Sequence, residues 1–136
     1  ILAGESIEVF NNGEMKRDFT YIDDIINGLL SLLDSPPNAI DNWNGQITDP
    51  SSSKAPFKLY NIGNNSPVKL MDFIDEIEKQ LGKKAEIDYK PLQPGDVVSS
   101  HADVQSLAED FGYRPTTIVA EGIRKFIEWY KGFYHT

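Results

Sequence analysis

Three stretches of the chain space their apolar side chains as an amphipathic helix does, and this periodicity constrains the fold more than any other feature. Such a stripe is stable only when it packs against another element, so each stretch predicts a helix on a shared core. The three stripes consist of Ile22, Ile25, Ile26, Leu29, Leu30 and Leu33; of Leu70, Phe73, Ile74, Ile77 and Leu81; and of Val119, Ile123, Phe126, Ile127, Tyr130 and Phe133.

Helix boundaries follow from local chemistry. Asp23 is expected to begin the first helix, and Ser35-Pro36-Pro37 ends it because proline cannot continue a helix. Ser66 is predicted to cap the second helix with Pro67 at its first position, and Gly82 to stop it. Between the second and the last of these helices, Asp103 is predicted to cap an additional short helix that ends near Phe111-Gly112. Pro115 and Thr117 are predicted to start the last helix.

Short extended segments lie between these helices. Residues 7–10 alternate and run into the turn Asn11-Asn12-Gly13, and the stretch from Arg17 to Tyr21 could pair back on them as a hairpin. Residues 57–61 are predicted to form a short buried strand, and residues 85–89 a third extended segment. The expected fold class is therefore α+β, with a few short strands and about four helices in one domain over residues 1–136.

A long polar loop interrupts this pattern at residues 36–56, which are rich in Pro, Asn, Asp and Ser. A loop of this length is unusual inside a compact domain and predicts a surface insertion. The first residues, Ile1-Leu2-Ala3-Gly4, are typical of the last turn of a helix closed by glycine. They indicate that the chain is a fragment.

Composition excludes several classes of function. A net charge of −8 argues against binding to nucleic acid or to an anionic membrane. The absence of cysteine removes thiolate zinc sites and cysteine nucleophiles, and it fits the cytoplasm. No apolar run approaches the roughly 20 residues of a membrane span. His101 and His135 lie far apart and share no metal-ligand spacing with carboxylates, so no metal site is expected.

Two segments carry candidate binding residues. In the run from Lys16 to Asp24, an arginine on an extended segment leads straight into a helix with two acids at its start. The Arg17 guanidinium offers a planar fork for phosphate oxygens, although an exposed arginine before a well-capped helix would look the same. In Gln93-Pro94-Gly95-Asp96, a tight turn could aim an amide and a carboxylate at ribose hydroxyls, or be an ordinary turn.

Together these segments resemble the extended short-chain dehydrogenase/reductase family of sugar-nucleotide epimerases and dehydratases, over essentially the whole chain. The resemblance rests on Arg-Asp-Phe-Thr-Tyr-Ile-Asp-Asp at residues 17–24, Tyr-Asn-Ile-Gly-Asn-Asn-Ser-Pro at 60–67, Gln-Pro-Gly-Asp at 93–96 and Thr-x-x-x-Glu-Gly at 117–122. The long insertion with Trp43, together with Gln93 and Pro94, favours the UDP-glucuronate 4-epimerase subfamily. The resemblance implies that the chain is the small C-terminal substrate-binding domain.

The resemblance also implies roles for single residues. Arg17 would contact the diphosphate of a UDP-sugar, Asp96 would bind the ribose, and Gln93 would lie near ribose and phosphates. Phe10, at the end of the first strand, would lie against the uracil. Asp18, like Asp23, would be structural, orienting the arginine or capping the helix.

Two family motifs are missing from the sequence. There is no glycine-rich NAD fingerprint, and no tyrosine is followed four residues later by lysine. We therefore expect no catalytic residue and no NAD site in this chain; the N-terminal Rossmann half of a homodimeric enzyme would supply both. Other epimerases, dehydratases or decarboxylases of the family remain alternatives, as does a non-catalytic acidic interaction module.

Overall fold

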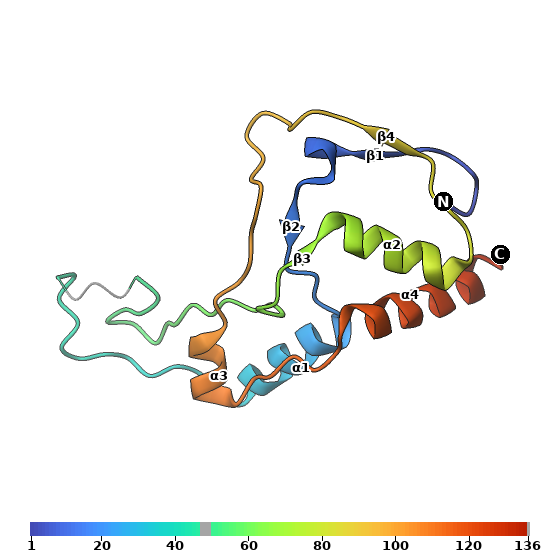
Figure 1. Cartoon of the computed structure of the whole chain (residues 1–136). Helices are drawn as coiled ribbons and strands as arrows, with labels where there is room; N and C mark the ends of the chain where they lie inside the picture. The colour runs from blue at the N-terminus through green and yellow to red at the C-terminus, as the bar shows by residue number, and fades with distance from the viewer. Residues whose placement is uncertain (47–49, 136) are drawn as a thin grey trace.

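Two pairs of short strands and four α-helices make up the part of the chain that the structure, a computed structural model, describes: residues 1–46 and 50–135 (Figure 1). In chain order the elements are β1 (Ile7–Val9), the 3₁₀ helix η1 (Phe10–Gly13), β2 (Lys16–Arg17), α1 (Ile22–Leu33), β3 (Val68–Lys69), α2 (Leu70–Leu81), β4 (Ile87–Tyr89), α3 (Gln105–Phe111) and α4 (Val119–Tyr134). The expected class, short strands with about four helices, is confirmed.

Each strand pairs with a segment far away in the sequence. β1 runs parallel to β4, with Ile7 opposite Ile87, and β2 runs antiparallel to β3, with Arg17 opposite Val68. The predicted hairpin between the first two extended segments is therefore wrong. Asn11 and Asn12 both adopt φ of 50°, and this left-handed pair turns the chain away from β1 instead of folding it back.

Two helices begin later than the sequence predicts. β3 occupies the two residues before Leu70, so Ser66 and Pro67 precede a strand rather than a helix. α4 starts at Val119 because the backbone N–H groups of Thr116 and Thr117 are engaged by a side chain of α1. The predicted helix ends are confirmed: Gly82 and Gly112 take left-handed φ of 65° and 67° after α2 and α3.

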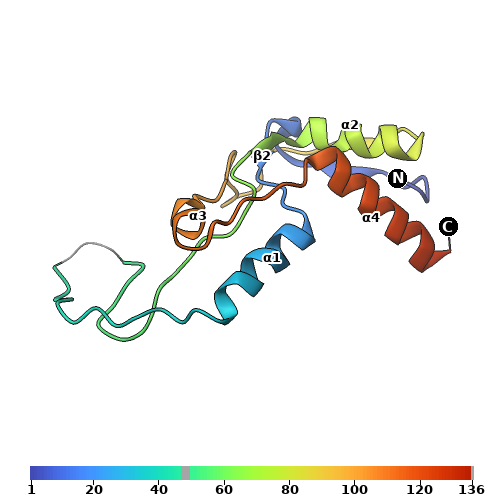
Figure 2. The same ribbon diagram turned by 90° about the horizontal axis from the view of Figure 1, so that it is seen from below.

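The predicted buried strand at residues 57–61 is also wrong. The segment forms a single bridge between Ser52 and Lys58, and the side chains of Phe57 and Leu59 are exposed. The described parts of the polar loop, residues 36–46 and 50–56, extend from the end of α1 away from the helices in both views (Figures 1 and 2). The apolar residues of 57–61 therefore lie at the base of a projecting loop rather than in a sheet.

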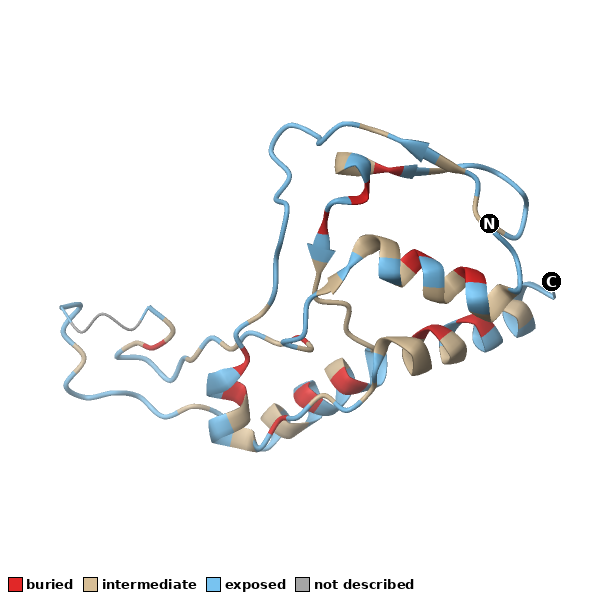
Figure 3. Ribbon diagram, in the orientation of Figure 1, coloured by how far each residue is buried: buried red, intermediate tan, exposed pale blue. Residues whose placement is uncertain are grey.

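Two small clusters of buried residues hold the helices together (Figure 3). Where α1 meets α3, Val104, Leu107 and Tyr113 are buried. Where α2 packs along α4, Ile74 of α2 and both Ile123 and Ile127 of α4 are buried. Among the described residues no helix is long and apolar enough to cross a bilayer.

Much of the apolar surface of α1 and α4 nevertheless stays exposed. Leu33 of α1 is 73% exposed, and Phe133 of α4 is 62% exposed. An apolar groove of about 800 Å³ runs beside α4 and is lined by Ile1, Phe19, Ile22, Phe73, Phe126 and Tyr130, among others. Most of the stripe on α1 and part of the stripe on α4 thus lack the partner that the sequence pattern predicts.

Candidate functional site

Arg17 is held in place by three hydrogen bonds at the edge of the β2–β3 pair. Its Nη2 donates to Asp96 Oδ1 at 2.8 Å, and its Nη1 donates to the carbonyl oxygens of Lys16 and Val98 at 2.9 and 3.4 Å. The side chains of Arg17 and Asp96 are 28% and 33% exposed, so water still reaches the pair. A guanidinium carries five N–H donors, and the remaining donors can meet an anionic ligand.

Asp96 reaches Arg17 because of the turn that precedes it. The backbone N–H of Asp96 donates to the carbonyl oxygen of Gln93 at 3.1 Å, and Gly95 takes the positive φ of 86° that this turn requires. The backbone N–H of Lys16 then binds the carbonyl oxygen of Val98 at 2.9 Å. Residues 93–98 are thereby tied to β2, and two motifs separated by 79 residues form one site.

A polar pocket of about 410 Å³ opens beside Arg17. Its lining comes from the end of β2, from the turn before β3 and from the segment after Asp96: Arg17, Asp18, Thr20, Asn61, Ile62, Gly63, Ser100, His101 and Ala102. Most of these groups can donate or accept hydrogen bonds, and one is a cation. The pocket can therefore hold a polar ligand with an anionic group.

The other two predicted site residues lie apart from this pocket. Phe10 is half-buried at the start of η1, which packs on β4 through the bond from the N–H of Asn12 to the carbonyl oxygen of Lys90. Gln93 is exposed, and its carbonyl oxygen serves the turn. The structure thus brings Arg17 and Asp96 together, and of the four predicted site residues only Arg17 is among those that line the pocket.

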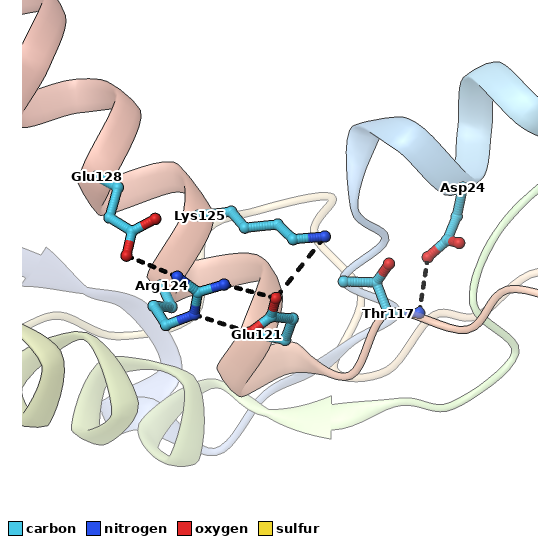
Figure 4. A network of polar contacts seen from close by, with 6 residues as sticks. All are labelled: Asp24, Thr117, Glu121, Arg124, Lys125 and Glu128. Atoms are coloured by element: carbon cyan, nitrogen blue, oxygen red, sulfur yellow. Dashed lines mark hydrogen bonds and ion pairs between the residues drawn. The ribbon is translucent and has the colours of Figure 1, made fainter.

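Two carboxylates beside the site have structural roles. Asp18 accepts hydrogen bonds from the backbone N–H groups of Asn65, Ser66 and Ala102, as expected for a structural residue, although it does not orient the arginine. Asp24 of α1 is 5% exposed. It accepts hydrogen bonds from the backbone N–H groups of Thr116 at 3.2 Å and of Thr117 at 3.0 Å, which fixes the segment before α4; Figure 4 shows the bond from Thr117.

Burial and hydrogen bonding act in opposite directions on Asp24. Burial raises the pKa of its carboxyl group, but the bonds from Thr116 and Thr117 together outweigh burial and leave that pKa below its ordinary value. The Tyr113 phenol is buried, and burial together with the charges of Asp24 and Asp18 raises its pKa. Asp24 is therefore a charged, fully engaged group, and Tyr113 a neutral one.

The other two arginines do not line the pocket. Arg124 of α4 donates to Glu121 through Nε and Nη2, at 2.8 and 2.7 Å, and to Glu128 through Nη1 at 2.6 Å (Figure 4). Its charge is neutralised within α4. Arg114 is exposed between α3 and α4. Arg17 is thus the arginine available to a ligand of this pocket.

Sequence reasoning missed part of the lining. Ser100 and His101 line the pocket, although no sequence motif singles out either of them as a binding residue. Their position four and five residues after Asp96 is the one signal that could have placed them. Within the described ranges, no cluster of three His, Cys, Asp or Glu residues could hold a metal ion.

Comparison with known proteins identifies the chain's family. The model of the GDP-mannose 4,6 dehydratase family matches residues 1–126. The chain is 46% identical over 134 residues to Protein CapI of Staphylococcus aureus, covering 98% of this chain and 40% of that protein. It is 40% identical over 138 residues to UDP-glucuronate 4-epimerase 6 of Arabidopsis thaliana, covering 98% of this chain and 29% of the relative.

Solved structures agree with the sequence relatives. The crystal structure of UDP-glucuronic acid 4-epimerase from Bacillus cereus, in complex with UDP-glucuronic acid and NAD, superposes with a TM-score of 0.75 at 26% identity. The superposition covers 98% of this chain and 37% of that one. This chain spans about 40% or less of the length of these relatives, and it belongs to the GDP-mannose 4,6 dehydratase family of sugar-nucleotide epimerases and dehydratases.

Proposed function

We propose that this chain is the C-terminal, UDP-sugar-binding part of a longer NAD-dependent epimerase that converts UDP-glucuronate to UDP-galacturonate. The observation that carries the proposal is the ion pair between Asp96 and Arg17, the arginine that lines the polar pocket, in a chain whose relatives include UDP-glucuronate 4-epimerases. In a domain of net charge −8, a diphosphate needs a local cation, and Arg17 supplies it.

Arg17 and Asp96 bind different parts of the nucleotide in this proposal. Arg17 binds the diphosphate, a charge-assisted contact worth roughly 1.5–3 kcal/mol. Asp96 binds Arg17 through Oδ1, so its second oxygen can accept a ribose hydroxyl. Gln93 would lie near the ribose and phosphates, and Phe10 against the uracil, once the ligand spans the distance from the pocket to η1.

Binding the unreactive nucleotide positions the sugar for reaction. Epimerisation at C4 requires that hydride leave the carbon, that the 4-keto sugar turn, and that hydride return to the other face. NAD would accept and return that hydride. Because the sequence carries no glycine-rich NAD fingerprint, we assign NAD binding to the N-terminal half of the longer enzyme. In this proposal the chain binds the UDP moiety, and the hydride transfers take place in the N-terminal half of the enzyme.

The rest of the enzyme has a place to pack. The exposed apolar faces of α1 and α4 and the groove of about 800 Å³ make a surface that a stable soluble domain would normally cover. The relatives are at least about twice as long as this chain. We assign this surface to the N-terminal Rossmann half, through which the homodimer would also form.

The test uses the full-length protein that contains this chain, with UDP-glucuronate as substrate and UDP-galacturonate measured by chromatography. Arg17→Ala should raise KM at least tenfold, since one charge-assisted contact is lost. Lys16→Ala is the matched control, because it removes a neighbouring positive charge whose exposed side chain does not line the pocket. Equal effects of the two substitutions would refute the assignment. If the enzyme converts UDP-glucose or UDP-galactose instead, the proposed substrate is wrong, while the UDP-binding role of Arg17 is retained.

A further inference from the structure

Asp18 joins segments that lie far apart in the sequence. Its Oδ2 accepts the backbone N–H of Asn65 at 2.9 Å and of Ala102 at 3.3 Å, and its Oδ1 accepts the N–H of Ser66 at 3.1 Å. The two donor segments are the turn before β3 and the end of the chain segment that carries Asp96. A carboxylate has only acceptors, which suits a position faced by three N–H donors.

The packing around this carboxylate leaves little room for movement. A Cβ atom on Gly63 would lie 2.8 Å from Asp18 Oδ2 and 2.7 Å from the Cβ of Ala102. The Tyr113 hydroxyl, in the buried cluster between α1 and α3, donates to the carbonyl oxygen of Gly63 at 3.0 Å. The turn at Gly63 is therefore anchored to the core on one side and to Asp18 on the other.

These same groups form the walls of the polar pocket. Asp18, Gly63 and Ala102 all line it, together with Arg17 and Ser100. The segment with Asp96 is fixed to β2 and the residue after it at three points: the N–H of Lys16 donates to the carbonyl of Val98, the N–H of Ser100 donates to the carbonyl of Lys16, and the N–H of Ala102 donates to Asp18. Between these points lies the stretch that faces a ligand of Arg17.

We propose that Asp18 is a positioning residue of the nucleotide site, which sets the width of the pocket beside Arg17 by clamping its two walls together. This inference rests on the proposed UDP-sugar function. Asp18 does not touch the ligand in this role. Its charge is taken up by three N–H donors, so it holds the walls without cancelling the attraction of Arg17 for the diphosphate.

The experiment measures UDP binding by calorimetry, and KM and kcat for UDP-glucuronate, in the full-length enzyme. Asp18→Asn replaces one acceptor oxygen by an NH₂ group that faces a backbone N–H. We expect the Kd for UDP and the KM to rise at least tenfold, while kcat stays within about threefold. Asp23→Asn is the control, because Asp23 is exposed on α1 and should leave all three constants unchanged.

The outcomes separate the two proposals. If the unmodified enzyme binds no UDP, both the proposed function and the role of Asp18 fail. If it binds UDP and Asp18→Asn binds equally well, or loses kcat with KM unchanged, only the positioning role fails. Should Asp18→Asn not fold, hydrogen exchange in the unmodified enzyme decides: saturating UDP must slow exchange at the amides of Asn65, Ser66 and Ala102 at least fivefold, and unchanged exchange overturns the proposal.

Discussion

The two hydrogen bonds that Asp24 accepts from the backbone N–H groups of Thr116 and Thr117, just before α4, allow a direct test of what stabilises this fold. In Asp24→Asn, the side chain keeps one oxygen for one of the two threonine amides and presents an NH₂ group to the other. Losing one hydrogen bond to a buried charged group costs about 1.5–3 kcal/mol. Losing a negative charge in the first turn of α1 costs about 0.3–1 kcal/mol more. The expected loss in unfolding free energy is therefore about 2–4 kcal/mol.

Asp23 provides the matched control, because it lies in the same first turn of α1 but is exposed. Asp23→Asn removes the helix-end charge and no hydrogen bond given by the structure, so it should cost only about 0.3–1 kcal/mol. Urea unfolding followed by circular dichroism, with equal slopes in all variants, gives both values. If the two substitutions agree within about 0.5 kcal/mol, the threonine amides do not depend on Asp24 and the reasoning fails.

The same variant predicts a dependence on pH. The folded pKa of Asp24 lies below its ordinary value, so the folded state favours the charged form. Its contribution is then fully present above the unfolded pKa of about 3.9 and is lost as pH falls through the lower folded pKa. The difference in unfolding free energy between the wild type and Asp24→Asn should be constant above about pH 5 and shrink below about pH 4. A difference that persists unchanged at pH 2 would contradict the assignment.

Four further substitutions test the packing. Gly63→Ala should destabilise the chain by about 1–3 kcal/mol, because the added Cβ would contact Ala102. Gly132→Ala, in α4 with nothing within 4 Å of the added Cβ, should stabilise the chain by about 0.5–1 kcal/mol. Thermal unfolding compares the two variants, and a change in stability of the same sign in both would contradict the close approach at Gly63. Tyr113→Phe should cost about 0.5–1.5 kcal/mol by removing the bond to Gly63, as urea unfolding would measure, and no loss would mean that the hydroxyl is not needed. Phe133→Ser should reduce the binding of a hydrophobic dye to the chain without lowering its helix content, since Phe133 lies on the exposed apolar face; unchanged dye fluorescence would count against that face.

Short-range sequence patterns located the helices and two of their ends, but they placed the starts of two helices too early. Apolar spacing located all three long helices, and Gly82 and Gly112 marked two ends, because periodicity and left-handed glycine act within a few residues. Ser66 and Pro67 do not start a helix, because the next two residues, Val68 and Lys69, pair with β2 as strand β3. Such pairing depends on a segment about fifty residues away, which no local pattern contains.

The candidate site divides in the same way. Arg17 and Asp96 were selected from their motifs and a family resemblance, and their direct ion pair came only from the fold. The pocket residues Ser100 and His101 have no motif of their own, since they face the site only because backbone bonds tie residues 96–102 to β2.

The sequence by itself determined the helical stripes, the turn chemistry, the acidic charge and the absence of NAD and tyrosine–lysine motifs, because each is written in neighbouring residues. The tertiary structure decided which strands pair, where α4 begins and what Asp18 and Asp24 hold. Those outcomes depend on backbone N–H groups that must find acceptors once buried. Distant backbone carbonyls accept them in the strand pairs, and Asp18 and Asp24 accept them from residues 47 to 93 positions away. The motif singles out Arg17, and the fold adds the ion pair that joins it to Asp96.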